Sequence, residues 1–136
     1  MKVTVTTDEP IIMVDDSETD QLIAKRCYQK SILQNSFLTF SEGPTFLSYM
    51  DSVSTNQAPM PALVLLDLNM PIMDGFEVLK SIRSRHEFAH LPNLLILTNS
   101  DNPKDADRSR ALGANGFHVK PLQAAEFIAF FNSLKG

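Results

Sequence analysis

The sequence contains one cysteine, no long apolar segment and no excess of positive charge. Cys27 cannot form a disulfide within the chain, which favours a reducing compartment. No apolar run approaches the roughly 20 residues of a membrane span, and the start, MKVTVTTDEP, has no signal-peptide core. The formal net charge of −4 offers no attraction for nucleic acid or an anionic membrane surface. We therefore expect a cytoplasmic protein with neither kind of partner.

The length and composition fit one folded domain. The chain has 136 residues, 43% of them hydrophobic, which is enough for a full core. It has no internal repeat and no linker that would divide it. We expect a single domain over residues 1–136, with its core from about 10 to 134 and with no output domain.

Short apolar runs alternate with segments of helical periodicity. The runs lie at residues 11–14, 63–66, 94–97 and 117–119, with a weaker one at 35–41. The second and third are continuously hydrophobic, which is typical of parallel strands covered on both faces. Five strands alternating with helices predict an α/β fold, a five-stranded parallel sheet with helices on both faces.

Capping residues indicate where the helices begin. Ser17 is a candidate N-cap for a helix that would place Leu22, Ile23 and Cys27 on one face. A short helix is predicted over 43–50, followed by a polar connection over 52–61.

Three further helices have their own start signals. Asp74 and Glu77 form a candidate capping box. Asn102-Pro103 would begin a polar helix that ends before Gly113, and Pro121 would begin the last helix.

Polar residues follow four of the predicted strands. Asp15-Asp16, Asp67, Thr98 and Lys120 each stand where an apolar run ends. In a parallel sheet these strand ends share one edge, which is where open α/β sheets bind ligands. Each residue alone also fits a structural role: a helix cap, a loop carboxylate, a strand-end hydroxyl or a helix start. If these roles were the whole explanation, four unrelated polar groups would have come together at one edge by coincidence. We therefore favour the interpretation that they form a common site.

The residue types indicate phosphoryl chemistry. Three close carboxylates repel one another and need positive charge, which a hard divalent cation and Lys120 can supply. Mg²⁺ fits best, because it binds one or two carboxylates and keeps waters that a phosphate can displace. Asp67 could then attack phosphorus, while Thr98 and Lys120 bind the phosphoryl oxygens.

The sequence resembles a response-regulator receiver domain of two-component signalling, similar to a stand-alone chemotaxis receiver. The most specific match is D-x-N-M-P-x-M-D-G, residues 67–75, with the acidic pair, Thr98 and Lys120-Pro121 in the family's order. The resemblance implies a flavodoxin-like doubly wound sheet of strand order 2-1-3-4-5.

It also implies a role for each site residue. Asp67 would be the phosphoacceptor, supplied by a sensor histidine kinase or a histidine phosphotransfer protein. Thr98 and Lys120 would bind the phosphoryl group, and Thr98 and Phe117 would form the switch. Mg²⁺ would be held by Asp15, acting largely through water, by Asp16 and Asp67, and by the backbone carbonyl of Asn69.

Two positions depart from the family's pattern. Phe117 stands where many members have tyrosine, so it lacks that hydroxyl, and Asn99 replaces a small residue next to Thr98. The insertion-like segment 83–93 is similar to that of receivers that partner phytochrome-type or hybrid kinases. Output is expected through binding of a downstream protein, and Phe130 is a hypothetical contact for a partner or a homodimer.

Two other functions compete with a phosphorylatable switch. A degenerate receiver that only binds partners would not need this complete set of site residues. A Mg²⁺ phosphatase of the haloacid-dehalogenase type favours an aspartate two residues after the nucleophile, where this chain has Asn69. We expect self-catalysed phosphorylation and dephosphorylation, without turnover of a metabolite.

Overall fold

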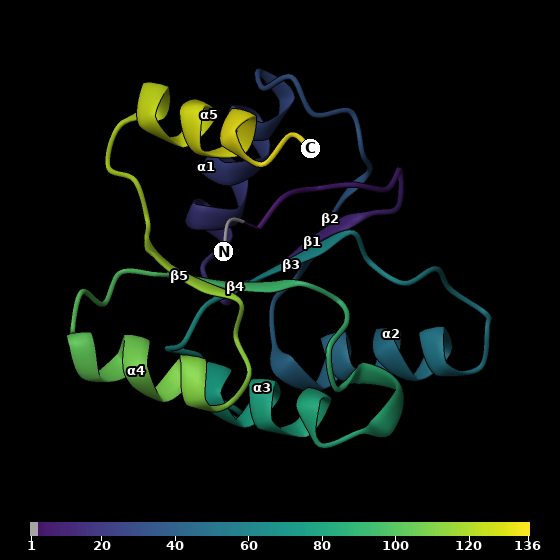
Figure 1. Ribbon diagram of the computed structural model, residues 1–136. Coiled ribbons are helices and arrows are strands. Elements are labelled where there is room, and N and C mark those ends of the chain that lie inside the picture. Colours follow the sequence, from purple (N-terminus) through teal and green to yellow (C-terminus); the bar gives the residue numbers. More distant parts are fainter. Residues whose placement is uncertain (1–2) are drawn as a thin grey trace.

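Five parallel strands form one sheet in the computed structural model, which describes residues 3–136 (Figure 1). Their order is β2-β1-β3-β4-β5, so the predicted doubly wound arrangement is confirmed. In register, Ile11 lies between Phe37 and Leu63. The strands are β1 (Ile11–Val14), β2 (Phe37–Phe40), β3 (Leu63–Leu66), β4 (Leu94–Thr98) and β5 (Gly116–Val119).

Helices cover both faces of the sheet. Figure 1 shows α1 and α5 together on one face, and α2, α3 and α4 on the other. The bounds are α1 (Glu18–Gln29), α2 (Gly43–Ser54), α3 (Gly75–Arg83), α4 (Pro103–Ala111) and α5 (Ala124–Ser133), with a short 3-10 helix, η1 (His86–Phe88).

Each central strand contributes to two cores. Ile12 and Val14 pack among the residues beneath α2 and α3, whereas Ile11 and Met13 pack toward α1 and α5. Successive strand side chains point to opposite faces, so a strand covered on both sides must be apolar throughout. This explains the continuous hydrophobic runs, and it leaves the strand ends as the place for charged groups.

Several helix boundaries follow the predicted signals. The Ser17 side chain caps α1 by accepting from Asp20 N at 3.1 Å, and Asp74 and Glu77 form the capping box of α3. α2 is longer than predicted and extends through Ser54. The prediction that Pro121 begins the last helix is wrong: Lys120 N still pairs with the strand-end carbonyl of Thr98, so the chain crosses from the sheet before α5 begins.

The face of α1 differs from the prediction. Cys27 is buried as expected, together with Ala24 and Tyr28, but Leu22 and Ile23 are 49% and 45% exposed. The Tyr28 ring lies 4.7 Å from that of Phe37 and 5.2 Å from that of Phe131. An aromatic cluster of this size dominates local packing and sets the rotation of the helix.

Arg83 links the segment 83–93 to the connection between α4 and β5. Its guanidinium donates to the carbonyls of Gly113 and Phe88 and to Asn115 Oδ1, at 3.0 to 3.2 Å. Gly113 ends α4 with a φ of 107°, a conformation that favours glycine, as the sequence predicted.

The two ends of the described chain pair with each other. Val5 forms a parallel bridge with Lys135, and Val5 N donates to Leu134 O at 2.6 Å. Over residues 3–136, no helix combines the length and the apolar character that crossing a bilayer requires.

Candidate functional site

Asp67 lies at the carboxyl end of the central strand β3. Its main-chain N–H donates to Val14 O at 3.0 Å, which continues the pairing with β1. The side chain is buried, and its Oδ1 accepts from Leu68 N at 2.8 Å. This carboxylate is therefore held in one orientation at the edge of the sheet.

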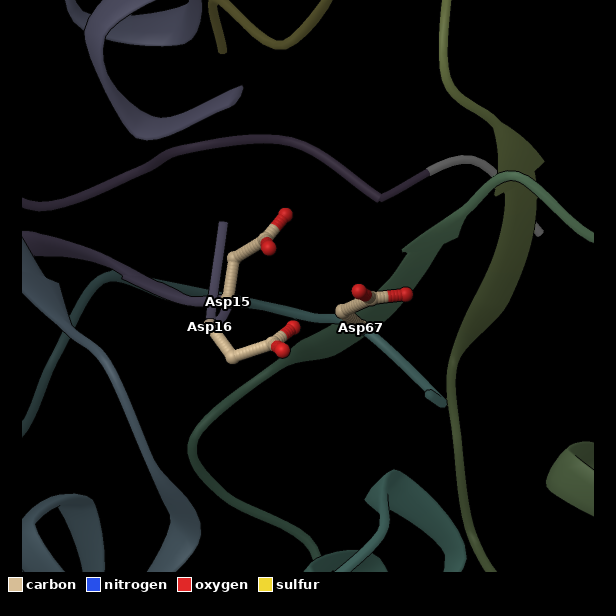
Figure 2. A group of neighbouring side chains, drawn as sticks. All are labelled: Asp15, Asp16 and Asp67. Atoms are coloured by element: carbon tan, nitrogen blue, oxygen red, sulfur yellow. The ribbon is translucent and has the colours of Figure 1, made fainter. Parts of the chain in front are cut away.

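Asp15 and Asp16 follow the neighbouring strand β1. Figure 2 shows their side chains next to that of Asp67. The three residues each offer a carboxylate oxygen, and these oxygens lie within 4.8 Å of one another. Asp15 is fully buried and accepts from Ser17 N at 2.9 Å, whereas Asp16 is exposed. The predicted acidic cluster is present.

Lys120 brings positive charge to this cluster from the end of β5. Its Nζ lies 2.6 Å from Asp15 Oδ2, 2.8 Å from Asp20 Oδ2 and 3.5 Å from Asp67 Oδ2. Only 7% of the lysine side chain is exposed. Three carboxylates that are far from Lys120 in the sequence thus surround its ammonium group.

Burial and pairing shift two pKa values in this cluster. Burial raises the pKa of Asp15, while the contacts with Lys120 and Ser17 N oppose that shift. Burial alone would lower the pKa of Lys120, but hydrogen bonds to Asp15 and Asp20 and the charge of Asp67 more than offset it, and the pKa is raised. Lys120 therefore stays protonated at neutral pH.

Thr98 occupies the end of β4, beside Lys120. Its side chain is fully buried, and its Oγ1 accepts from Ser100 N at 3.4 Å. Asn99 is exposed and, with Asp20 and Lys120, lines a cavity of about 200 Å³ at this edge. The hydroxyl and the ammonium predicted at the same edge are both there.

The two aromatic candidates are half-buried. Phe117 on β5 packs against the core beneath α2–α4. Phe130, the hypothetical partner contact, is half-buried because its ring lies 5.2 Å from that of His118 and 5.5 Å from that of Phe131. Asn69 is exposed in the loop after Asp67.

The acidic cluster suits a hard divalent cation. Its three side-chain donors are all carboxylates, the ligand type that Mg²⁺ prefers. Asp15 Oδ2 is fully buried with the Lys120 ammonium 2.6 Å away as its close partner, which leaves a further lone pair of this carboxylate oxygen unused. A buried oxygen of this kind gains from a metal ion or a metal-bound water.

Asp20 is the member of the site that the sequence interpretation missed. It lies three residues after the N-cap Ser17, in the first turn of α1. That spacing from Ser17 could have predicted that Asp20 lies at the same edge of the sheet. Its pairing with Lys120, however, could be predicted only from the path of the last strand.

Comparison with known proteins points to one family. The model of the response regulator receiver domain matches residues 11–132. Response regulator Rcp1 of Synechocystis is 29% identical over 81% of this chain and 75% of its own length. Chemotaxis protein CheY-3 of Vibrio cholerae is 32% identical over 85% and 82%.

Solved structures give the same result. Response regulator RPA3017, described in red light signalling of R. palustris, superposes with a TM-score of 0.81 at 30% identity, covering 92% of this chain and 90% of that one. The phosphorylated cyanobacterial phytochrome response regulator RcpA gives 0.78 at 27% identity, with 90% and 88% covered. The Mn²⁺-bound form of Rcp1 gives 0.76 at 26% identity, with the same coverage.

Proposed function

The chain belongs to the response regulator receiver domain family, and we propose that it is a cytoplasmic phosphorelay switch whose phosphoacceptor is Asp67. Receiver domains take phosphoryl groups from histidine kinases or histidine phosphotransfer proteins, and we assign the same donors here. The proposal is supported most directly by the meeting of Asp15, Asp16 and Asp67 within 4.8 Å, with Lys120 Nζ 3.5 Å from Asp67.

The reaction is an in-line transfer of a phosphoryl group. A carboxylate oxygen of Asp67 forms an O–P bond while the P–N bond of a phosphohistidine donor breaks. The electron pair leaves with the imidazole, which carries or receives a proton. Because the hydrogen bond from Leu68 N fixes one Asp67 oxygen, the other faces the cleft near Lys120.

Each neighbouring residue has one task in this step. Lys120 binds one phosphoryl oxygen through its ammonium, and the Thr98 hydroxyl donates to another. Asp15, Asp16 and Asp67, together with the Asn69 carbonyl, would hold Mg²⁺, which when bound would offset the negative charge of the phosphoryl group. The Mn²⁺-bound form of Rcp1 supports a metal requirement of this kind.

The same site removes the phosphoryl group slowly. Water attacks phosphorus, the O–P bond to Asp67 breaks, and the carboxylate is restored with release of phosphate. The protein catalyses its own modification and its reversal, and it does not turn over a metabolite. Asn69 stands where a dehalogenase-type phosphatase has its acid–base aspartate, so efficient hydrolysis is not expected.

Phosphorylation changes the conformation of the protein through Thr98 and Phe117. A hydrogen bond from Thr98 to the phosphoryl group shifts this side chain within the buried end of β4. Phe117 lies on the adjacent strand, in register with Ile96, and packs half-buried against the α2–α4 core. Movement of Thr98 permits the Phe117 ring to turn inward, which favours one of two pre-existing conformations.

The signal leaves through binding of a downstream protein or through a homodimer. Phe130 is the candidate contact on α5. Phe130→Ala should weaken partner binding or self-association of the phosphorylated protein, measured by sedimentation velocity. Unchanged association would discard this role for Phe130.

The test is phosphorylation by a small donor. We expect the protein, incubated with Mg²⁺ and acetyl phosphate, to gain the mass of one phosphoryl group. Asp67→Asn should gain none, while Asp8→Asn, at an exposed carboxylate away from the site, should behave as wild type. Equal labelling of Asp67→Asn would place the acceptor elsewhere and overturn the proposal.

A further inference from the structure

We propose that Asp20 is a positioning residue that restrains Lys120 and thereby limits the maximal rate of Asp67 phosphorylation. This inference rests on the proposed function of Asp67. Asp20 lies in the first turn of α1 and does not belong to the set of site residues that the family motif identifies.

The lysine is held by two short contacts and one long one. Its ammonium has three N–H donors. Asp15 Oδ2 and Asp20 Oδ2 lie 2.6 and 2.8 Å from Nζ, within the range of charge-assisted contacts, while Asp67 Oδ2 is at 3.5 Å. The lysine is therefore bound closest to the two carboxylates that do not accept the phosphoryl group.

Phosphoryl transfer requires the Lys120 ammonium to lie close to Asp67 instead of the other two carboxylates. A phosphoryl group on Asp67 needs the Lys120 ammonium as a partner for one of its oxygens, so the ammonium must turn toward Asp67. Each short contact opposes that movement, because a charge-assisted hydrogen bond has to weaken as the new one forms. Restraint of Lys120 thus adds to the free-energy barrier for phosphoryl transfer to Asp67.

Asp20 is the contact that specifically provides this restraint. Asp15 is also assigned to the metal, so its charge is shared between two partners. Asp20 Oδ2 accepts a hydrogen bond from Lys120 Nζ across 100 residues of sequence, and its side chain is 31% exposed. It can therefore be changed without opening the buried part of the site.

Glu18 provides a matched control for charge. It lies in the same first turn of α1 and is exposed, so Glu18→Gln removes one negative charge near the helix N-terminus as Asp20→Asn does. Loss of charge alone should help a dianionic donor to bind, which lowers the donor concentration at half-maximal rate. Release of Lys120 should instead raise the maximal rate.

The experiment measures phosphorylation rates against acetyl phosphate concentration, with saturating Mg²⁺. We expect Asp20→Asn to raise the maximal rate about three- to tenfold. Glu18→Gln should keep the wild-type maximum, and Asp20→Glu, which retains the carboxylate, should return toward it. In the metal-free protein, Asp20→Asn should also weaken the slowly exchanging ¹⁵N signal of the Lys120 ammonium.

Failures of the two proposals can be distinguished. A wild-type protein that takes no phosphoryl group on Asp67 would overturn the proposed function before any variant is compared. If wild type is phosphorylated but Asp20→Asn has the same or a lower maximum, the restraint by Asp20 is refuted. Equal gains in Asp20→Asn and Glu18→Gln would refute it too, because net charge would then explain both.

Discussion

The main chain of Asp67 runs directly against Gly75, with no room for a side chain between them. A Cβ on Gly75 would lie 2.8 Å from Leu68 Cα and 3.0 Å from the carbonyl carbon of Asp67. The Gly75 N–H donates to Leu68 O at 2.9 Å, which closes the loop after the phosphoacceptor. The start of α3 thus fixes the position of Asp67.

Gly75→Ala should therefore damage both stability and function. The added methyl meets main-chain atoms, so the loop must shift, at a cost of about 1–3 kcal/mol in the free energy of unfolding. Phosphorylation of Asp67 should slow as well. The comparison is Gly43→Ala, for which the atoms nearest to the added methyl belong to the side chains of Val78 and Met73 and not to the main chain. Urea unfolding and initial rates test both, and equal effects of the two changes would contradict the argument.

Mg²⁺ should stabilise the folded protein through the acidic cluster. At about 100 times the dissociation constant, binding confined to the folded state adds ~2.7 kcal/mol, or roughly 10 °C in Tm for a chain of this size. Asp16→Asn removes an exposed ligand and should lose more than half of that shift at the same Mg²⁺ concentration. Asp8→Asn serves as the control and should keep all of it. Thermal unfolding with and without Mg²⁺ is the measurement, and a full shift in Asp16→Asn would exclude Asp16 as a ligand.

Ile72 adopts a strained backbone conformation. Its φ is 70°, in the left-handed region that β-branched residues avoid, and its side chain is 81% exposed. Asparagine tolerates this region, so Ile72→Asn should stabilise the protein by about 1 kcal/mol in urea unfolding. Ile32→Asn is the comparison, since Ile32 is also exposed but, among residues 3–136, only Asn56 and Ile72 are non-glycine residues with positive φ. Equal effects at both positions would show that exposure, not strain, is being measured.

His118 should make stability depend on pH. The residue is exposed, but its ring lies 5.2 Å from that of Phe130, and desolvation lowers its pKa. The unfolded chain therefore binds a proton more readily than the folded one, so stability rises with pH between the lowered pKa and the ordinary value of about 6.5. Acidification through that window should destabilise the wild type, and His118→Gln should reduce the slope. Denaturation midpoints from pH 5 to 8 measure it, with His90→Gln as the exposed control. An identical slope in His118→Gln would assign the dependence to other groups.

The sheet and the predicted site residues were readable from the sequence because their signals are local. Continuous apolar runs ending in Asp67 or Thr98 identify both a buried strand and the edge to which it points. Parallel pairing then brings Asp15 and Lys120 to that edge whatever the details of packing. The metal and phosphoacceptor assignments for these residues stay proposals until the site is tested chemically.

Features that depend on packing between distant segments could not be predicted from the sequence. The rotation of α1 follows from Tyr28 meeting Phe37 and Phe131, and this exposes Leu22. Phe130 is half-buried because of its contact with His118 on a neighbouring element. The partner of Asp20 lies 100 residues away, so local periodicity gave no indication of it.

The bridge between Val5 and Lys135 has a practical consequence. It lies near Asn35, which precedes β2, and therefore at the sheet edge opposite to Asp67. A fluorescent reporter or a surface tether attached near Val5 or Lys135 would lie away from the phosphoacceptor. Protein immobilised there should then remain open to a kinase, and a pair of fluorophores at these two positions would sit too close together to sense events at the far edge.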